Sequence, residues 1–421
     1  MSDLLPQRSA LISQFEEHLA RARYSSTASR RYLAVAEHFL KYIECWHVPI
    51  DAVQPSHVRK YLTRELRQFS RRHGHAPVSV DHWRGSHTAG VHQFLQCVVG
   101  QWPPSATANG PNEADCQAIC AEYAQWLRER RGLAAETISD RTAEAGRFLS
   151  WYGERNEAST LSAVAIADVD AYLQSRAPSL RRVSRKGVAQ RMRCFLRFAH
   201  ATGRTERDFA PCVMAPTLYA FESIPSALSP DQVDAVMQTS RKDPSPKGLR
   251  DYAILLLLAT YGMRAGEVTR LQLNDIDWRA DRIFVRHTKT GSQSILPLMP
   301  AVGEALLAYL RRGRPKTDVR EIFIRMRAPY RGFESGSSLY TSTRRRLDAA
   351  GVQPDGKRGP HAFRHARAVS LLRDGTPMKI IGDVLGHRSA SSTSVYLKLA
   401  TEDLRDVALE IPGLAEEEEQ S

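Results

Sequence analysis

The sequence predicts a mainly helical protein of the α+β class, in which helical bundles precede a mixed block that contains one small β-hairpin. Apolar residues recur at intervals of three and four along most of the chain, which is the spacing of amphipathic helices. One short stretch, residues 281–297, instead carries β-branched and leucine residues on either side of a turn. Two segments rich in proline and small residues, 101–115 and 211–230, divide the 421 residues into three blocks. We therefore expect domains at residues 1–100, 115–210 and 226–412, followed by an acidic tail at 413–421.

The composition is that of a soluble globular chain with an excess of positive charge. Hydrophobic residues make up 42% of the chain, and 59 Lys and Arg against 46 Asp and Glu leave a formal net charge of +13. This excess favours a polyanionic partner, although an ordinary basic protein can have the same balance. The first residues lack the apolar stretch of a signal peptide, and the longest apolar run, residues 253–259, is too short to cross a bilayer. We expect a cytoplasmic protein without membrane contacts, and its six cysteines show no metal-ligand spacing.

The first two blocks have similar patterns of aromatic and leucine residues. Matching positions recur in the same order about 110 residues apart. The matched aromatic residues are Phe15 and Tyr123, Phe39 and Phe148, Tyr61 and Tyr172, and Phe94 and Phe195. Each block is predicted to form a small bundle of about four helices. Chance similarity between amphipathic helices is one explanation, and a diverged duplication is the one that we favour.

The end of the second block is strongly basic. Residues 176–207 contain ten Lys and Arg but a single acid, Glu206, whereas a solvated helix face normally mixes both signs. This run predicts a surface that contacts phosphates. The candidate contacts with a DNA backbone are Arg181, Arg182, Arg185, Lys186, Arg191 and Arg193.

The third block combines helices with the hairpin. Ser229 followed by Pro230 is a typical helix start, with serine as the N-cap and proline in the first turn. Helical patterns cover residues 248–258, 264–271, 301–310 and 340–350, and they resume over the last sixty residues or so. Between them, residues 281–297 are predicted to form the β-hairpin, with Lys289 near its tip.

Residue types in this block suit phosphodiester exchange. Such a reaction without metal or ATP needs fixed cations on the attacked phosphate, a proton donor for the leaving oxygen and a nucleophile that holds the cut strand. His361 and Arg364 are three residues apart and share one helical face. Arg264 stands at a helix start, with Glu267 placed to orient it. Tyr396 follows His387 by nine residues.

Four stretches of the third block resemble the signature boxes of the tyrosine recombinase (phage integrase) family. They are residues 260–271 (TYGMRAGEVTRL), 287–291 (HTKTG), 361–365 (HAFRH) and 385–396 (LGHRSASSTSVY). Each box alone is a weak signal, and HxxR is commonplace. The four boxes occur in the family's order within about 135 residues, which makes the combined signal strong.

The resemblance implies a role for each matching residue. Arg264 and Arg364 would clamp the scissile phosphate, and Lys289 would be the general acid for the leaving 5′-hydroxyl. His361 would assist proton transfer, and His387 would hydrogen-bond the phosphate. Tyr396 would attack to form a 3′-phosphotyrosyl link that retains the bond energy, so that rejoining needs no cofactor. Glu267 would support Arg264 or serve only as a structural ion-pair partner. We expect His365 to pack or to support its neighbours rather than to act in catalysis.

The resemblance also implies an organisation and a partner. Residues 115–210 would be the helical core-binding domain that grips double-stranded DNA, whereas residues 1–100 would be an extra domain for DNA or for protein contacts. The helical tail after Tyr396 would pack on its own domain or on a neighbouring subunit. We expect a homo-oligomer, a tetramer on synapsed DNA, with related recombinases as further candidate partners. Two alternatives stay open, namely a type IB topoisomerase that relaxes DNA and a catalytically inactive DNA-binding protein on the same fold.

Overall fold

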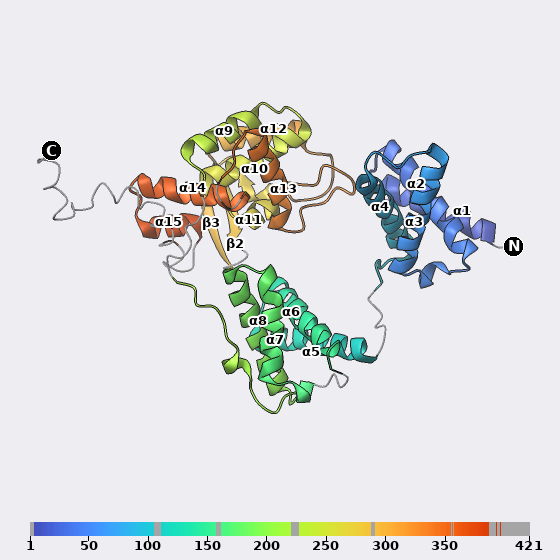
Figure 1. Ribbon diagram of the computed structural model, residues 1–421. Helices are drawn as coiled ribbons and strands as arrows, with labels where there is room; N and C mark the ends of the chain where they lie inside the picture. The colour runs from blue at the N-terminus through green and yellow to red at the C-terminus, as the bar shows by residue number, and fades with distance from the viewer. Residues whose placement is uncertain are drawn as a thin grey trace, which may run out of the picture. The chain divides into compact units, whose positions relative to one another are not determined.

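The computed structural model describes residues 4–104, 111–156, 161–219, 227–287, 291–354, 356, 358–386, 393 and 396. Helices dominate these residues, and one three-stranded sheet lies in the last block (Figure 1). The chain divides into two compact units, one of residues 101–222 and the other of residues 1–100 together with 223–421. No helix in the described part of the chain is long and apolar enough to cross a membrane. The predicted fold class, mainly α with a small sheet, is confirmed.

The first block forms four helices, as the sequence predicts. They are α1 (Leu4–Arg21), α2 (Ser26–Cys45), α3 (Pro55–His73) and α4 (Val80–Val99). The Ser25 hydroxyl caps α2 by accepting the Ala28 amide hydrogen bond at 3.3 Å. Gly74, with φ +72°, ends α3 in the left-handed conformation that glycine adopts without strain. The buried side chains come from all four helices and include Phe15, Phe39, Tyr61 and Phe94.

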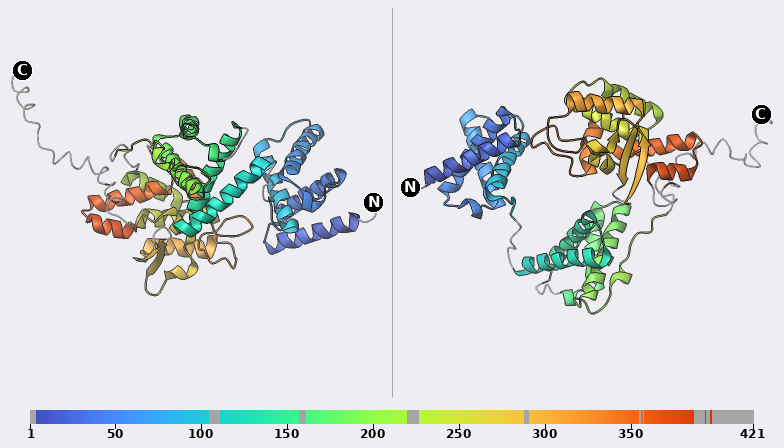
Figure 2. Two further views of the ribbon diagram at one scale, coloured as in Figure 1. Left: turned by 90° about the horizontal axis from the view of Figure 1, so that it is seen from below. Right: turned by 180° about the vertical axis from the view of Figure 1, so that it is seen from behind.

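The second block also forms four helices, and Figure 2 shows the ribbon diagram in two further views. They are α5 (Pro111–Arg131), α6 (Ala135–Gly153), α7 (Ile166–Arg176) and α8 (Arg182–Ala201). Their core is a cluster built around Tyr123, Phe148, Tyr172 and Phe195. One carboxylate, Glu144, is buried in this bundle and accepts hydrogen bonds from the Tyr172 hydroxyl at 2.6 Å and from Arg147 at 2.7 Å. The prediction of two four-helix blocks is confirmed.

The third block contains the remaining α-helices of the described residues. They are α9 (Pro230–Arg241), α10 (Pro246–Tyr261), α11 (Ala265–Arg270), α12 (Pro300–Ala308), α13 (Leu339–Ala349), α14 (Pro360–Arg373) and α15 (Met378–Leu385). The helix start at Ser229 is confirmed, because its hydroxyl accepts from the Gln232 amide at 3.2 Å while the Gln232 side chain accepts from the Ser229 amide at 3.0 Å. These reciprocal bonds satisfy two amide groups that the first turn of a helix leaves without partners.

The sheet of the third block is antiparallel, with strand order β1 (Ile276–Asp277), β2 (Arg282–His287) and β3 (Ser292–Pro297). Ile283 pairs with Leu296 and Val285 with Ser294, so β2 turns Ile283, Val285 and His287 to the buried side. The hairpin predicted at residues 281–297 is therefore confirmed for its two strands. Its tip at residues 288–290, which includes Lys289, lies outside the described residues.

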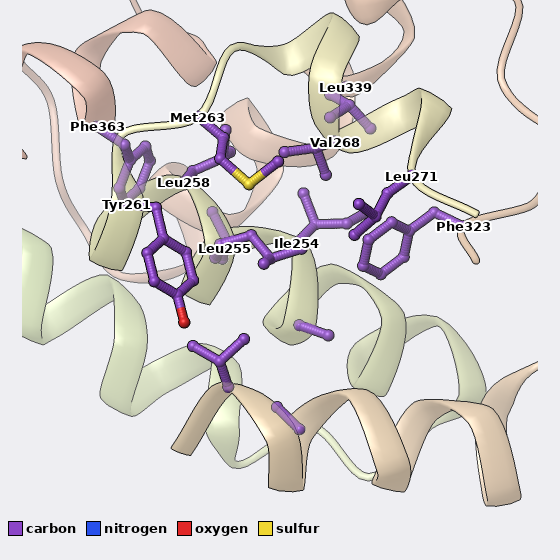
Figure 3. Close-up of a cluster of buried hydrophobic side chains, with 14 of the residues drawn as sticks. Ile254, Leu255, Leu258, Tyr261, Met263, Val268, Leu271, Phe323, Leu339 and Phe363 are labelled. Carbon is purple, nitrogen blue, oxygen red and sulfur yellow. The ribbon is translucent and has the colours of Figure 1, made fainter. Parts of the chain in front are cut away.

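The core of the third block surrounds α10, which packs against α9, α12 and α14. Figure 3 shows side chains of α10, among them Leu255, Leu258 and Tyr261, gathered with Met263 and with Phe363 of α14. Phe363 is fully buried and directly precedes Arg364, so core packing holds this part of α14 against the end of α10. Helices α14 and α15 lie side by side and enclose a smaller apolar cluster of Ala368, Ile381, Leu385 and Tyr396 (Figure 1).

Candidate active site

The turn between α10 and α11 positions Arg264. Gly262, with φ +65°, ends α10 and lets the chain reverse, and Arg264 becomes the N-cap residue of α11. Glu267 binds Arg264 twice, accepting from its backbone amide at 2.7 Å and from Nη1 at 2.8 Å. The carboxylate predicted to orient this arginine therefore contacts it directly.

Glu267 also binds the root of the hairpin. The Nδ1 of His287, at the end of β2, donates to Glu267 Oε1 at 2.7 Å, and its Nε2 lies 2.8 Å from the Ser294 hydroxyl on β3. Burial raises the pKa of Glu267, but the hydrogen bonds from His287 and Arg264 outweigh it and bring the pKa below its ordinary value. An ionised carboxylate thus links α11, with its arginine, to the strand that leads into the segment carrying Lys289.

Arg364 lies on α14 and is only 4% exposed. Its Nη1 donates to the Gly262 carbonyl at 2.7 Å and its Nη2 to the Leu385 carbonyl at 2.6 Å. Arg264 reaches the adjacent residue, because its Nη2 donates to the Gly386 carbonyl at 3.0 Å. The two guanidinium groups therefore converge where α10 and α15 end. Burial lowers the pKa of Arg364 to about 10, and the charge of Arg264 acts in the same direction, so Arg364 keeps its proton at neutral pH.

Tyr396 lies against α14 and is 3% exposed. Its hydroxyl is 3.3 Å from Nδ1 of His365, one residue after Arg364. Burial raises the pKa of Tyr396 above its ordinary value, although the charge of Arg364, a hydrogen bond from it, and the charge of Arg264 act against this rise. The resting phenol is therefore neutral at physiological pH, and an imidazole lies within reach of its proton.

His361 and His365 form a stacked pair on successive turns of α14. Their rings are 6.3 Å apart at 29°, and His361 is exposed while His365 is half-buried. The sequence predicts a role for His361 and only a packing or supporting role for His365. The structure places His365, not His361, against the Tyr396 hydroxyl. The one signal in the sequence was its position four residues after His361, on the same helical face.

The structure brings together Arg264, Glu267, Arg364 and Tyr396 from the predicted set. Lys289 and His387 lie outside the described residues, but residues beside them in sequence belong to this site. Gly386 packs on His287 so closely that a Cβ atom at residue 386 would lie 2.7 Å from the imidazole ring. Among the described residues, no group of three His, Cys, Asp or Glu side chains can hold a metal ion.

The basic residues predicted to contact DNA lie on or beside α8. Arg181, Arg182 and Arg185 are exposed, and Lys186 is half-buried. Two others contact residues of their own block, because Arg191 pairs with Asp140 at 2.6 Å on the surface and Arg193 donates to the Val213 carbonyl at 2.7 Å. These two arginines help to hold the bundle together, and their contact with DNA stays a prediction.

Comparisons with known proteins agree with this fold. The family model described as Phage integrase family matches residues 226–403. Over 190 residues the chain is 59% identical to y4gC of Sinorhizobium fredii, a protein named as an integrase/recombinase, covering 45% of this chain and 97% of that one. It is also 32% identical to tyrosine recombinase XerD of Mycobacterium tuberculosis, covering 68% of this chain and 94% of the relative.

Solved structures share the fold at low sequence identity. XerH site-specific recombinase bound to palindromic difH substrate matches with a TM-score of 0.55 at 14% identity, covering 70% of this chain and 87% of that one. A lambda integrase dimer bound to a COC′ core site matches with a TM-score of 0.53 at 18% identity, covering 66% and 94%. Fold, site and relatives together define a DNA-recombining enzyme. The chain belongs to the phage integrase family and is a tyrosine-type recombinase.

Proposed function

We propose that this recombinase cuts and rejoins double-stranded DNA at a specific site, using Tyr396 as the nucleophile and a 3′-phosphotyrosine as the intermediate. The observation that carries the proposal is the environment of the Tyr396 hydroxyl. This hydroxyl is buried, lies 3.3 Å from a histidine nitrogen and receives a hydrogen bond from a buried arginine. A tyrosine that only stabilised the core would need neither a histidine nor an arginine beside its hydroxyl.

The attack begins with a neutral phenol. The Tyr396 oxygen bonds to the phosphorus as its proton passes to Nδ1 of His365, and His361 assists through the stacked pair. As the new phosphorus–oxygen bond forms, the bond to the 5′-oxygen breaks. The leaving oxygen takes a proton from Lys289. A lysine suits this step better than an arginine, because an ammonium group gives up its proton more readily than a guanidinium group.

The two arginines stabilise the charge that develops on the attacked phosphate. Arg264 and Arg364 each use some of their donors on backbone carbonyls, and their remaining N–H groups serve the nonbridging oxygens. His387 adds a further hydrogen bond to the phosphate. Because the phosphotyrosyl ester retains the energy of the broken bond, the free 5′-hydroxyl of a second strand reverses the same steps, and no cofactor is needed.

The other blocks bind and arrange the DNA in this proposal. Residues 115–210 form the core-binding domain, with the exposed Arg181, Arg182 and Arg185 on phosphates, and residues 226–412 form the catalytic domain. A relative in the solved structures is a lambda integrase tetramer bound to a Holliday junction, and its fold is shared here at a TM-score of 0.51. We extend this assembly to the present chain, as a homotetramer on synapsed DNA.

The proposal is tested by trapping the intermediate on nicked duplexes. A library of nicked duplexes with a randomised centre is incubated with the full chain, and adducts that resist denaturing detergent are digested and sequenced by mass spectrometry. We expect a nucleotidyl peptide modified at Tyr396, and no adduct from Tyr396→Phe. Tyr340→Phe is the matched control, because this tyrosine of the same block is 46% exposed and should leave the adduct unchanged.

Two outcomes would overturn the proposal. An adduct on another residue would show that Tyr396 is not the nucleophile, and the absence of any adduct would favour a DNA-binding protein without cleavage activity. A relaxation assay on supercoiled plasmid separates recombination from the topoisomerase alternative. Relaxation of the plasmid by a monomer, without any exchange of strands between duplexes, would assign the chemistry to a type IB topoisomerase instead.

A further inference from the structure

Helix α3 of the first block has a stripe of positive charge that the proposed active site does not use. It contains six Arg and Lys residues and one acid, Glu65, which lies 3.7 Å from His38. Lys60, Arg64, Arg67 and Arg71 are spaced by four, three and four residues, so they share one face over about 16 Å of helix. All four are exposed, whereas Val58 and Tyr61, on other sides of the helix, are buried.

The stripe consists of like charges at neighbouring helical positions. Pairs at i+3 and i+4 with the same sign repel each other and destabilise a helix. No ion pair with an acid compensates Lys60, Arg67 or Arg71 within the described residues. Arg64 lies over the ring of Tyr42, 5.6 Å from its centroid. A charge pattern that opposes the stability of its own helix is better explained by a polyanionic partner than by folding.

The first block is built like the second block, which the proposed function places on DNA. The rings of Phe15 and Phe94 are 5.4 Å apart at 75°, and those of the matching Tyr123 and Phe195 are 5.3 Å apart at the same angle. In each block, this ring pair connects the first helix with the fourth.

A second pair of rings repeats as closely. Phe39 and Tyr61 are 5.1 Å apart at 77°, and Phe148 and Tyr172 are 5.3 Å apart at 77°. Two independent ring pairs with equal geometry indicate a duplicated bundle rather than chance similarity of helices. These are also the positions that the sequence pattern pairs.

The two bundles differ in which helix is basic. In the second block the fourth helix, α8, carries six Arg and Lys residues and no acid, while the third helix, α7, carries two acids and one arginine. In the first block the fourth helix, α4, carries only one arginine and one aspartate, and the third helix, α3, is the basic one. The duplicate therefore presents its positive charge from a different side of the bundle.

We propose that the exposed stripe of α3 binds the phosphate backbone of duplex DNA, which makes residues 1–100 a second DNA-gripping bundle with its own binding face. The inference rests on the proposed function in one respect, namely that DNA is the substrate. Thr63 and Gln68 flank the arginines and are of the types that hydrogen-bond phosphates. No large apolar side chain lies on the stripe, whereas a protein interface centres on such anchors. The contact is therefore independent of base sequence.

The test removes charge from the stripe of the full chain. In the α3 variant, Lys60→Gln, Arg67→Gln and Arg71→Gln are combined, and Arg64 is kept because it packs on Tyr42. The matched control combines Arg30→Gln, Lys41→Gln and Arg84→Gln, three exposed residues of α2 and α4 in the same bundle. Affinity for a long duplex of mixed sequence is measured by fluorescence anisotropy over a series of KCl concentrations.

We expect the α3 variant to bind the duplex about ten- to a hundredfold more weakly, and the slope of log affinity against log salt to fall by roughly two to three. The control should change neither quantity appreciably. Thermal melting shows that the variant is folded, and its midpoint should not fall, since like charges are removed. Equal affinity and slope for the wild type and the α3 variant would overturn the proposal and leave an acidic protein as the partner. Equal losses in the variant and the control would also overturn it, because total charge would then be the cause.

The same variants separate this inference from the proposed function. The matched control variant should form the Tyr396 adduct as the wild type does. If the wild type forms no adduct, the proposed function fails, and the difference in salt slope still decides whether α3 contacts DNA.

Discussion

The buried carboxylate of Glu267 accepts three hydrogen bonds. It accepts from the Arg264 amide, the Arg264 guanidinium and the His287 ring, all within 2.8 Å. Each bond is charge-assisted, and removing the charge leaves these buried donors with a weaker acceptor. Glu267 therefore positions both the first arginine and the root of the hairpin, although it lies outside the reacting atoms of the proposed mechanism.

We expect Glu267→Gln to lower the free energy of unfolding by about 1–3 kcal/mol at neutral pH, measured by urea titration. The pKa of Glu267 is lower in the folded chain than its ordinary value of 4.5, so its charge stabilises the fold above that pH. This contribution is lost as the pH falls below 4.5 and through the lower folded value, and the gap between wild type and variant should close there. Glu304→Gln, at an exposed position of α12, should have no such gap. A gap that does not depend on pH would contradict the ion-pair explanation.

At His365 the proposed proton acceptor can be distinguished from a residue that only positions Tyr396. We expect His365→Gln to slow formation of the covalent adduct by roughly 10²–10⁴-fold, because glutamine can hydrogen-bond the phenol but cannot take its proton. DNA affinity should be unchanged. His361→Gln, on the exposed ring of the stacked pair, should slow the reaction less. Rescue by glutamine would assign His365 a positioning role.

At the scale of elements, the sequence patterns predicted the helices and the strands, because these depend on the spacing of residues that are close together in the chain. The helices follow from apolar residues at intervals of three and four, and the strands of the hairpin follow from residues such as Ile283 and Val285, which β2 buries on one side. The order of the four boxes predicted which residues meet, because Arg264 and Arg364 do converge.

Contacts between distant segments were not predictable in this way. His365 and Tyr396 are 31 residues apart, and Tyr396 meets α14 in a cluster that it forms with Ala368 of this helix and with Ile381 and Leu385 of α15. Charge alone could not show that Arg193 turns inward to the Val213 carbonyl, because a long side chain chooses its partner from the tertiary structure. The sequence pattern thus predicts which residue types form the site, and the tertiary packing determines which partners they contact.

The end of α15 gives a prediction about close approach of the backbone. Gly386 has φ +63°, and a Cβ atom there would lie 2.7 Å from the His287 ring. Gly375, after α14, has φ +74° but no atom within 4 Å of its Cβ position. We expect Gly375→Ala to cost about 1 kcal/mol in unfolding free energy from backbone strain alone. Gly386→Ala should cost more and should also reduce adduct formation, because His287 must move. Equal costs and equal activity for the two variants would show that the approach at Gly386 is unimportant.

At the scale of the whole molecule, the second and third blocks each carry their own hydrophobic cluster. The cluster of the third block is formed by residues from 228 to 363, and that of residues 101–222 by residues from 123 to 213. A core that draws on residues of only one segment does not depend on the rest of the chain for burial. The predicted linker at residues 211–230 contributes Val213 to one cluster and Leu228 to the other, so the boundary between the two clusters falls within it.

This organisation predicts that residues 101–222 fold alone. We expect the excised fragment to have helical circular dichroism and a single cooperative transition in urea, since Tyr123, Phe148, Tyr172 and Phe195 all pack within it. Phe148→Ala should lower its free energy of unfolding by about 3–5 kcal/mol, because this ring is fully buried, whereas Val183→Ala at a 62% exposed position should change it by less than about 0.5 kcal/mol. A fragment that unfolds without a cooperative transition, or that responds equally to both substitutions, would show that the bundle needs the rest of the chain to fold.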